Sequence, residues 1–217
     1  MTRPTLIALK ILTWLACLVP LGLLVYRAVT NTLGPDPTAA ITFCTGATTL
    51  NLLTISLAIT PLRRLSPRLN WLIKFRRLFG LFAFFYATLH LLTYIALYAV
   101  FDIETMSTDI FKRRFITAGI VAWLLLLPLA ATSTNWAIRK LGGKQWNRLH
   151  KLVYFAAVLG VVHYWWQVKP GVLSPTTNTV ILTALLIARP IQSSYLTWRQ
   201  RRRLRPAGVT APSGRKV

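Results

Sequence analysis

Long apolar segments, separated by short polar stretches, make up most of this 217-residue chain. A helix needs roughly 20 mostly apolar residues to cross a bilayer. The segments that meet this requirement are residues 8–29, 41–61, 78–100, 115–132, 150–168 and 177–197. Turn-forming residues lie between several of them: Gly34-Pro35-Asp36-Pro37, Ser66-Pro67, Gly142-Gly143 and Lys169-Pro170-Gly171. The pattern predicts an all-α integral membrane protein, in which residues 1–205 form a six-helix transmembrane bundle and residues 206–217 form a disordered cytoplasmic tail.

The basic residues are distributed unevenly over the loops that this pattern predicts. An even number of spans puts both termini on one side of the membrane, and most lysines and arginines fall on that side. They are Arg3, Lys10, Arg63, Arg64, Arg68, Lys74, Arg76, Arg77, Arg139, Lys140, Lys144, Arg148, Lys151, Arg199, Arg201, Arg202, Arg203 and Arg205. Because loops rich in Lys and Arg stay in the cytoplasm, we expect both termini to be cytoplasmic.

The net charge of +22, from 26 basic and 4 acidic residues, would suggest a nucleic-acid partner in a soluble protein. Here the basic residues flank apolar segments, which favours topology signals and contacts with anionic lipid, so no nucleic acid is expected. The acids all fall in predicted outer loops: Asp36, Asp102, Glu104 and Asp109. The outer side also carries Lys112-Arg113-Arg114, which either anchors the fourth span or faces an acidic partner.

The three histidines, His90, His150 and His163, all lie in or at the edge of apolar segments. An ionisable side chain at that depth is costly and therefore a candidate functional residue, and imidazole is a common haem ligand. With a helical rise of about 1.5 Å per residue, His90 and His163 lie at a similar depth. This predicts a haem between the third and fifth spans, with one axial imidazole from each. The alternative is that each histidine only hydrogen-bonds the backbone of a neighbouring helix.

His150 has no histidine partner at its own level. Thirteen residues turn a straight helix by roughly 220°, so His150 and His163 would not face the same neighbour without a bend or tilt. Where a second ligand would sit on the third span, the chain has Arg76, with Arg77 beside it. Arginine has no lone pair for iron, but it could bind a haem propionate or a flavin phosphate. The alternatives are that Arg76 and Arg77 are inner-face anchors and that His150 is an interface residue.

Two stretches carry a family resemblance: FRRLFGLFAFFYATLHLLTY and LGGKQWNRLHKLVYFAAVLGVVHYWW. Together with six spans and two histidines thirteen residues apart in the fifth, they resemble the ferric-reductase-like transmembrane superfamily. Members usually carry four histidines. This chain has three, with a basic residue in place of the fourth and short loops, which is similar to the MsrQ family (also called YedZ).

That resemblance implies a haem b subunit of a methionine sulfoxide reductase system, located in a bacterial inner membrane. Such a subunit passes electrons to MsrP, a periplasmic molybdopterin enzyme, and receives them from the quinone pool or a cytosolic flavin reductase. Carried over by position, His90 and His163 would be metal ligands and His150 a ligand or cofactor contact. Arg76 and Arg77 would contact a cofactor. The resemblance also implies FMN and one or two haems, with the catalytic site on the partner.

Two other functions compete with this reading. The first is a free-standing ferric or quinone reductase from the same superfamily, which would act without MsrP. The second is a transporter whose histidines relay protons, which would need acidic partners within the membrane. The sequence places all four acids in outer loops, which disfavours the transporter.

Overall fold

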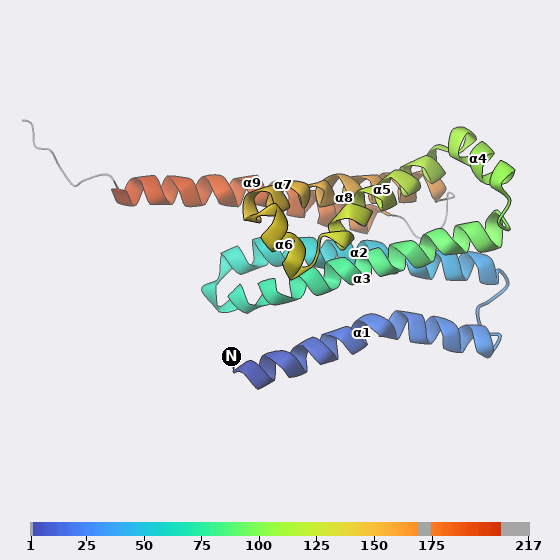
Figure 1. Ribbon diagram of the computed structural model, residues 1–217, viewed down its shortest axis with the longest axis horizontal. Coiled ribbons are helices and arrows are strands. Elements are labelled where there is room, and N and C mark those ends of the chain that lie inside the picture. The colour runs from blue at the N-terminus through green and yellow to red at the C-terminus, as the bar shows by residue number, and fades with distance from the viewer. Residues whose placement is uncertain (1, 169–174, 205–217) are drawn as a thin grey trace, which may run out of the picture.

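The computed structural model describes residues 2–168 and 175–204 (Figure 1). Within these residues the chain forms helices and no strand, so the all-α prediction is confirmed. The elements are α1 (Arg3–Val29), α2 (Pro37–Leu65), a 3₁₀-helix (Pro67–Leu72), α3 (Ile73–Thr93), a π-helix (Tyr94–Tyr98), α4 (Ile103–Lys112), α5 (Arg114–Ala131), α6 (Asn135–Leu141), α7 (Gly143–Leu149), α8 (Leu152–Gln167) and α9 (Thr176–Leu204). The predicted turn at 169–171 and the tail 206–217 lie outside the described residues.

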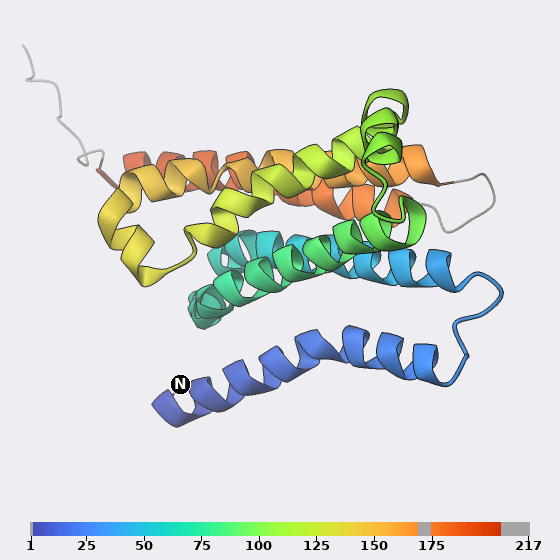
Figure 2. The same cartoon turned by 45° about the vertical axis from the view of Figure 1, so that its right-hand side comes forward.

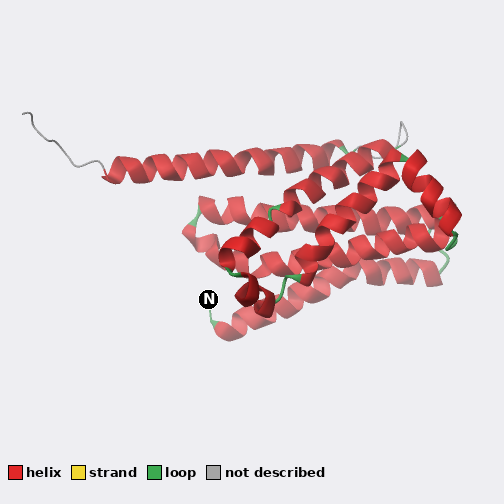
Figure 3. Cartoon of the chain, turned by 45° about the horizontal axis from the view of Figure 1, so that its top comes forward, coloured by secondary structure: helices red, strands yellow, loops and turns green. Residues whose placement is uncertain are grey.

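The long helices α1, α2, α3, α5, α8 and α9 run along a common axis (Figures 1 and 2). The short helix α4 lies at one end, and α6 and α7 lie toward the other (Figure 3). We call these the α4 end and the α6–α7 end. α1 begins and α9 ends at the α6–α7 end, so the described chain starts and finishes on the same side of the bundle.

In the described part of the chain, five helical stretches are long and apolar enough to cross a membrane: Arg3–Val29, Pro37–Leu65, Pro67–Tyr98, Arg114–Ala131 and Thr176–Arg199. The fifth predicted span, 150–168, is shorter than expected. α8 has 16 residues and is therefore roughly 24 Å long, below the 30 Å or so of a bilayer core. The reason is a turn at His150 and Lys151, which separates α8 from α7.

Two helix pairs frame the interior, α2 with α3 and α5 with α8. Small side chains allow the helices to approach closely: Ala83 on α3 is fully buried, and Ala156 and Ala157 on α8 are 1% exposed. Leu53 and Leu57 on α2 fill the space between the pairs. Close helix contacts through small residues are typical of membrane bundles.

A tyrosine on α3 ties α1 to this interior. The Tyr86 hydroxyl donates to the Cys17 carbonyl oxygen at 2.8 Å and accepts from the Leu21 amide at 3.1 Å. It therefore stands where an ordinary helical bond between Leu21 and Cys17 would run, next to Pro20, which has no amide hydrogen to donate. The insertion explains why α1 bends near its middle (Figure 1).

The short helices were not expected from the hydropathy pattern, which predicted only loops at these positions. Asp102 starts α4 by accepting from the Glu104 and Thr105 amides at 3.1 and 3.2 Å. Thr134 starts α6 by accepting from the Ala137 amide at 3.1 Å. Gly142, with φ of +74°, separates α6 from α7 in a conformation that other residues rarely adopt. These are local capping signals that segment-length reasoning does not detect.

Charge is segregated between the two ends. Asp36 precedes α2, and Asp102, Glu104 and Asp109 belong to α4 or its cap, so the acids gather at the α4 end. The last turn of α2, with Arg63 and Arg64, and the helices α6 and α7 put basic residues at the other end. They include Arg139, Lys140, Lys144 and Arg148. This is the segregation predicted from the sequence.

Candidate functional site

His90, on α3, is held against α2. Its Nδ1 lies 3.0 Å from the Thr42 carbonyl oxygen and 3.3 Å from Thr45 Oγ1. Because a carbonyl oxygen can only accept, Nδ1 carries the proton and Nε2 keeps its lone pair free. The ring fits because α2 has Gly46 at the contact, where a Cβ would lie 3.0 Å from His90 Cε1. α2 therefore fixes both the tautomer and the orientation of His90.

His163, on α8, is held against α5 in the same way. Its Nδ1 donates to the Phe115 carbonyl oxygen at 2.6 Å, and Gly119 makes room for the ring, since a Cβ there would lie 2.9 Å from Nδ1. Nε2 is buried and has no hydrogen-bond partner among the described residues. A buried polar atom without a partner is costly unless a ligand satisfies it, so this nitrogen is suited to binding a metal.

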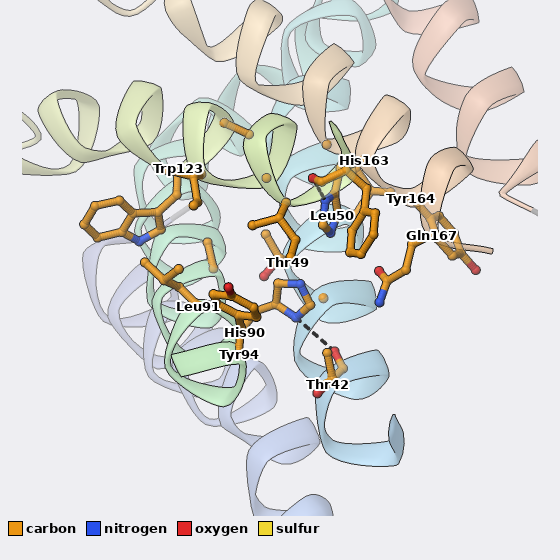
Figure 4. A pocket seen from close by; sticks show the side chains of 18 of the residues that line it. Thr42, Thr49, Leu50, His90, Leu91, Tyr94, Trp123, His163, Tyr164 and Gln167 are labelled. Carbon is orange, nitrogen blue, oxygen red and sulfur yellow. Dashed lines mark hydrogen bonds between the residues drawn. The ribbon is translucent and has the colours of Figure 1, made fainter. Parts of the chain in front are cut away.

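The two imidazoles face each other across the bundle (Figure 4). Their ring centroids are 5.8 Å apart and their planes are nearly perpendicular, at 86°. Metal–imidazole bonds are about 2 Å long, so two imidazoles bound through Nε2 to opposite sides of one ion have centroids about 6 Å apart. Two side chains are few for a bare ion but sufficient where a porphyrin supplies the other ligands. The residues present therefore fit a haem, whose iron His90 and His163 would hold.

A cavity of about 500 Å³ surrounds the two rings. Helices α2, α3, α5 and α8 all contribute to its lining, which is mostly apolar and includes Leu50 and Leu126. Trp123 forms part of the wall and donates through Nε1 to Thr88 Oγ1 at 3.1 Å, so its polar atom is satisfied (Figure 4). The volume lies in the usual range of cofactor sites, about 300–1,000 Å³.

The α4 end of the cavity has a polar rim. Arg113 lines the cavity and pairs through Nε with Asp109 Oδ1 at 2.9 Å. The Tyr94 hydroxyl donates to Asp109 Oδ2 at 3.1 Å. A guanidinium at this rim could bind a carboxylate of a ligand in the cavity. The sequence analysis missed this arrangement, although the spacing of Asp109 and Arg113, four residues apart, is that of a helical ion pair.

His150 lies outside this cavity. It caps α7, its ring stacks on Trp146 with centroids 3.7 Å apart, and its Nδ1 donates to the Trp146 carbonyl oxygen at 3.0 Å. Nε2 is 3.5 Å from Ser133 Oγ, a marginal contact. His150 and His163 were predicted to lie on one helix. A turn at His150 and Lys151 instead separates α7 from α8, so the two histidines do not lie on one straight helix. The structure thus brings His90 and His163 together and keeps His150 apart.

The two predicted arginine contacts point in different directions. Arg76 is half-buried near His150 and Tyr154, with which it interacts electrostatically. Arg77 is exposed and donates through Nη1 to Asn135 Oδ1 at 2.8 Å, at the start of α6. Neighbouring residues on a helix point about 100° apart, so only Arg76 shares the surroundings of His150.

Comparisons with known proteins agree with this architecture. The model of the family "Ferric reductase like transmembrane component" matches residues 43–161, more than half of the chain. A protein of Herminiimonas arsenicoxydans named "Protein-methionine-sulfoxide reductase heme-binding subunit MsrQ" is 46% identical over 200 residues, which cover 91% of this chain and 89% of that protein. A protein of the same name from Polaromonas naphthalenivorans is 47% identical over 83% of this chain and 81% of its own length. Another, from Ralstonia nicotianae, is 49% identical over 74% of this chain and 73% of its own. The chain is therefore a multi-pass membrane protein and belongs to the MsrQ family of ferric-reductase-like transmembrane proteins.

Proposed function

We propose that this chain is the haem-binding membrane subunit of a methionine sulfoxide reductase system and transfers electrons across the bilayer. The observation that carries the proposal is the pair His90 and His163, whose imidazoles face each other in a mostly apolar cavity. Each Nδ1 is engaged by a backbone carbonyl of a neighbouring helix, which leaves each Nε2 available for iron. The relatives' names, which include the words "heme-binding subunit", support the same assignment.

In this proposal His90 and His163 would hold haem b, and the carbonyls of Thr42 and Phe115 keep the two rings in place. Haem, when bound, supplies a centre that takes up and releases one electron at a time. Reduction of one methionine sulfoxide to methionine and water consumes two electrons and two protons. This chain would therefore deliver two electrons in succession, and its apolar cavity walls would exclude water from the ligands.

The proposed layout has six spans within residues 1–205, with α8 as a short fifth span. Both termini and the α6–α7 end would be cytoplasmic in the bacterial inner membrane, with residues 206–217 as a tail. Electrons would enter at the α6–α7 end, from the quinone pool or a cytosolic flavin reductase, and leave at the α4 end to periplasmic MsrP. Near the entry side, a ligand would contact His150, Arg76 and Arg77. This ligand would be FMN, quinone or a second haem.

The experiment that tests haem binding is the reduced-minus-oxidised visible spectrum of the detergent-purified full chain, with haem counted per chain. We expect a low-spin b-type spectrum that is lost in His90→Ala and in His163→Ala. Leu81→Ala, on the outward side of α3, is the matched control and should keep the wild-type spectrum. Haem retained in both histidine variants would overturn the assignment of His90 and His163 as ligands. No haem in a chain expressed with ample haem would overturn the whole proposal and favour a histidine-relay transporter.

The same preparation addresses haem number and partner. Half the haem content in His150→Ala would indicate a second haem at the α6–α7 end, whereas unchanged content would indicate one. Rapid oxidation of the reduced chain by MsrP with a methionine sulfoxide substrate would support the proposed partner. Oxidation by a ferric chelate alone, with no response to MsrP, would instead identify a free-standing ferric reductase.

A further inference from the structure

Arginines from three helices lie near one another at the α6–α7 end of the bundle, and two of them, Arg76 and Arg189, interact with Tyr154. Arg189 of α9 lies over the Tyr154 ring, with its Cζ 4.8 Å from the ring centroid. It also donates to the Tyr154 hydroxyl, and through Nη2 to the Leu57 carbonyl oxygen of α2 at 2.5 Å. Arg76 of α3 interacts electrostatically with Tyr154, with Arg63 of α2 and with Arg189. We call Arg63, Arg76, Arg189 and Tyr154 the arginine cluster.

The arginine cluster has no acidic counterpart. The sequence has only four acids, and all of them lie in or beside α4 or before α2, at the opposite end of the bundle. Among the described residues the only ion pair joins Arg113 to Asp109, also at that end. Buried charges are normally paired, and like charges held together in a region of low dielectric repel strongly. The cluster therefore has an unbalanced positive charge.

Hydrogen-bond donors in the cluster are unsatisfied too. The Nε atoms of Arg63 and Arg189 are buried and have no acceptor among the described residues. The Tyr154 hydroxyl accepts from Arg189, which leaves its own proton free to be donated. An anion with several oxygens would satisfy these donors and the charge together. Guanidinium groups match such oxyanions geometrically, and form strong charge-assisted bonds with them.

We propose that Arg63, Arg76 and Arg189, with the Tyr154 hydroxyl, form a binding site for a phosphate group. Phosphate carries up to two negative charges and several acceptor oxygens, so it balances this cluster better than a single carboxylate. The group comes either from a soluble phosphomonoester such as FMN or from the headgroup of an anionic phospholipid. This inference rests on the proposed function and deepens it, because it locates a phosphate-bearing ligand beside His150. The site involves neither His90 nor His163. Experiments can therefore show a loss of phosphate binding without a loss of haem binding, or the reverse.

Two variants test the site without removing any hydrogen bond that the cluster makes. Arg63 and Arg76 have no side-chain hydrogen bond in the described structure, so Arg63→Gln and Arg76→Gln should leave the fold intact. The matched control is Arg68→Gln, which removes an exposed positive charge near the end of α2. The folding check is the spectrum of the haem proposed between His90 and His163, whose cavity none of these three arginines lines, and it should match that of the wild type in each full-length variant.

Binding of FMN and of riboflavin is measured by flavin fluorescence, and binding of phosphatidylglycerol and phosphatidylcholine by native mass spectrometry. A soluble source predicts that FMN binds, riboflavin binds at least about tenfold more weakly, and inorganic phosphate competes. A lipid source predicts retention of phosphatidylglycerol over phosphatidylcholine. In either case Arg63→Gln and Arg76→Gln should weaken binding about tenfold or more, and Arg68→Gln less than twofold.

Thermal unfolding gives a second readout, because the melting temperature is expected to change in an unusual direction. Because removing one arginine relieves repulsion, ligand-free Arg63→Gln should melt at or above the wild-type temperature, and added ligand should stabilise it less than it stabilises the wild type. Equal binding by the wild type, Arg63→Gln and Arg76→Gln would overturn the proposal. An equal loss in Arg68→Gln would also overturn it, because the effect would then be general attraction by the basic surface.

Discussion

Gly119 and His163 are in such close contact that a Cβ on the glycine would lie 2.9 Å from Nδ1 of the imidazole. The same relationship recurs between Gly46 and His90, where the distance to Cε1 would be 3.0 Å. Both glycines have helical neighbours, and neither adopts a positive φ. Glycine is therefore required at both positions because an imidazole packs against it, and not because of the backbone conformation. Each histidine is packed against a helix that has no side chain at the point of contact.

Gly119→Ala should displace His163 from the position in which its ring faces His90. Real Cβ atoms are not found this close to other atoms, and overpacking of this kind costs about 1–3 kcal/mol. We expect a lower melting temperature and weaker haem retention, with Gly46→Ala acting similarly through His90. Gly22→Ala, whose Cβ would meet no atom within 4 Å, is the control. Identical melting temperatures and haem content for all three variants would contradict the packing argument.

Tyr86→Phe should weaken the attachment of α1 to the bundle. The buried hydroxyl bridges the Cys17 carbonyl and the Leu21 amide, and its loss leaves them to bond each other or remain unsatisfied, at a cost of about 1–3 kcal/mol. Tyr26→Phe removes a hydroxyl from an exposed position on the same α1 and should cost almost nothing. Denaturant unfolding in detergent compares the two. Equal midpoints would mean that the Tyr86 hydroxyl does not contribute to holding α1 against the bundle.

At the cavity rim, the Tyr94–Asp109 bond should contribute more stability than the Arg113–Asp109 ion pair. The Arg113 side chain is 57% exposed, whereas that of Asp109 is 11% exposed. Exposed ion pairs are worth about 0–1 kcal/mol, whereas a hydrogen bond to a charged acceptor is worth about 1.5–3 kcal/mol. Double-mutant cycles with Asp109→Ala and either Tyr94→Phe or Arg113→Gln measure the two couplings. The reverse order of coupling energies would contradict this ranking.

Asp102 should titrate below an ordinary aspartate. Its carboxylate accepts from the Thr105 hydroxyl at 2.5 Å and from the Thr105 and Glu104 amides, and these bonds lower its pKa from the usual 3.8. Because the folded-state pKa is lower than the unfolded one, the cap stabilises α4 above about pH 3.8. That stabilisation is lost as the pH falls through the folded pKa.

Carbon-13 NMR titration of the Asp102 carboxyl group in micelles measures this pKa directly. Thr105→Val should raise it, because the hydroxyl is the main cause of the shift. Thr108→Val, one turn further along α4, should leave it unchanged. An Asp102 that titrates like an unfolded aspartate would refute the cap geometry.

The sequence alone determined the features that depend on distance along one helix. The apolar segments gave the long helices, because a bilayer requires a fixed length of helix. The fixed helical rise also placed His90 and His163 at one level, and their rings do face each other. The number of predicted spans also placed Asp109 at the opposite end of the bundle from Arg63 and Arg64, as observed. The short length of α8 did not follow, because the turn at His150 and Lys151 has no Pro or Gly to mark it.

Which residues of different helices meet could not be predicted from spacing along the chain, because it depends on how the helices pack. Thr42 and Phe115 contribute through their carbonyl groups, which every residue has, so no sequence pattern could single them out. Gly46 and Gly119 became significant only once the rotation of α2 and α5 brought them against imidazoles. Arg76 was predicted to be an anchor or a cofactor contact, whereas Arg189, 113 positions later inside the last apolar segment, was not singled out. Their interaction depends on the relative positions and rotations of α3 and α9, which the packing of the whole bundle sets.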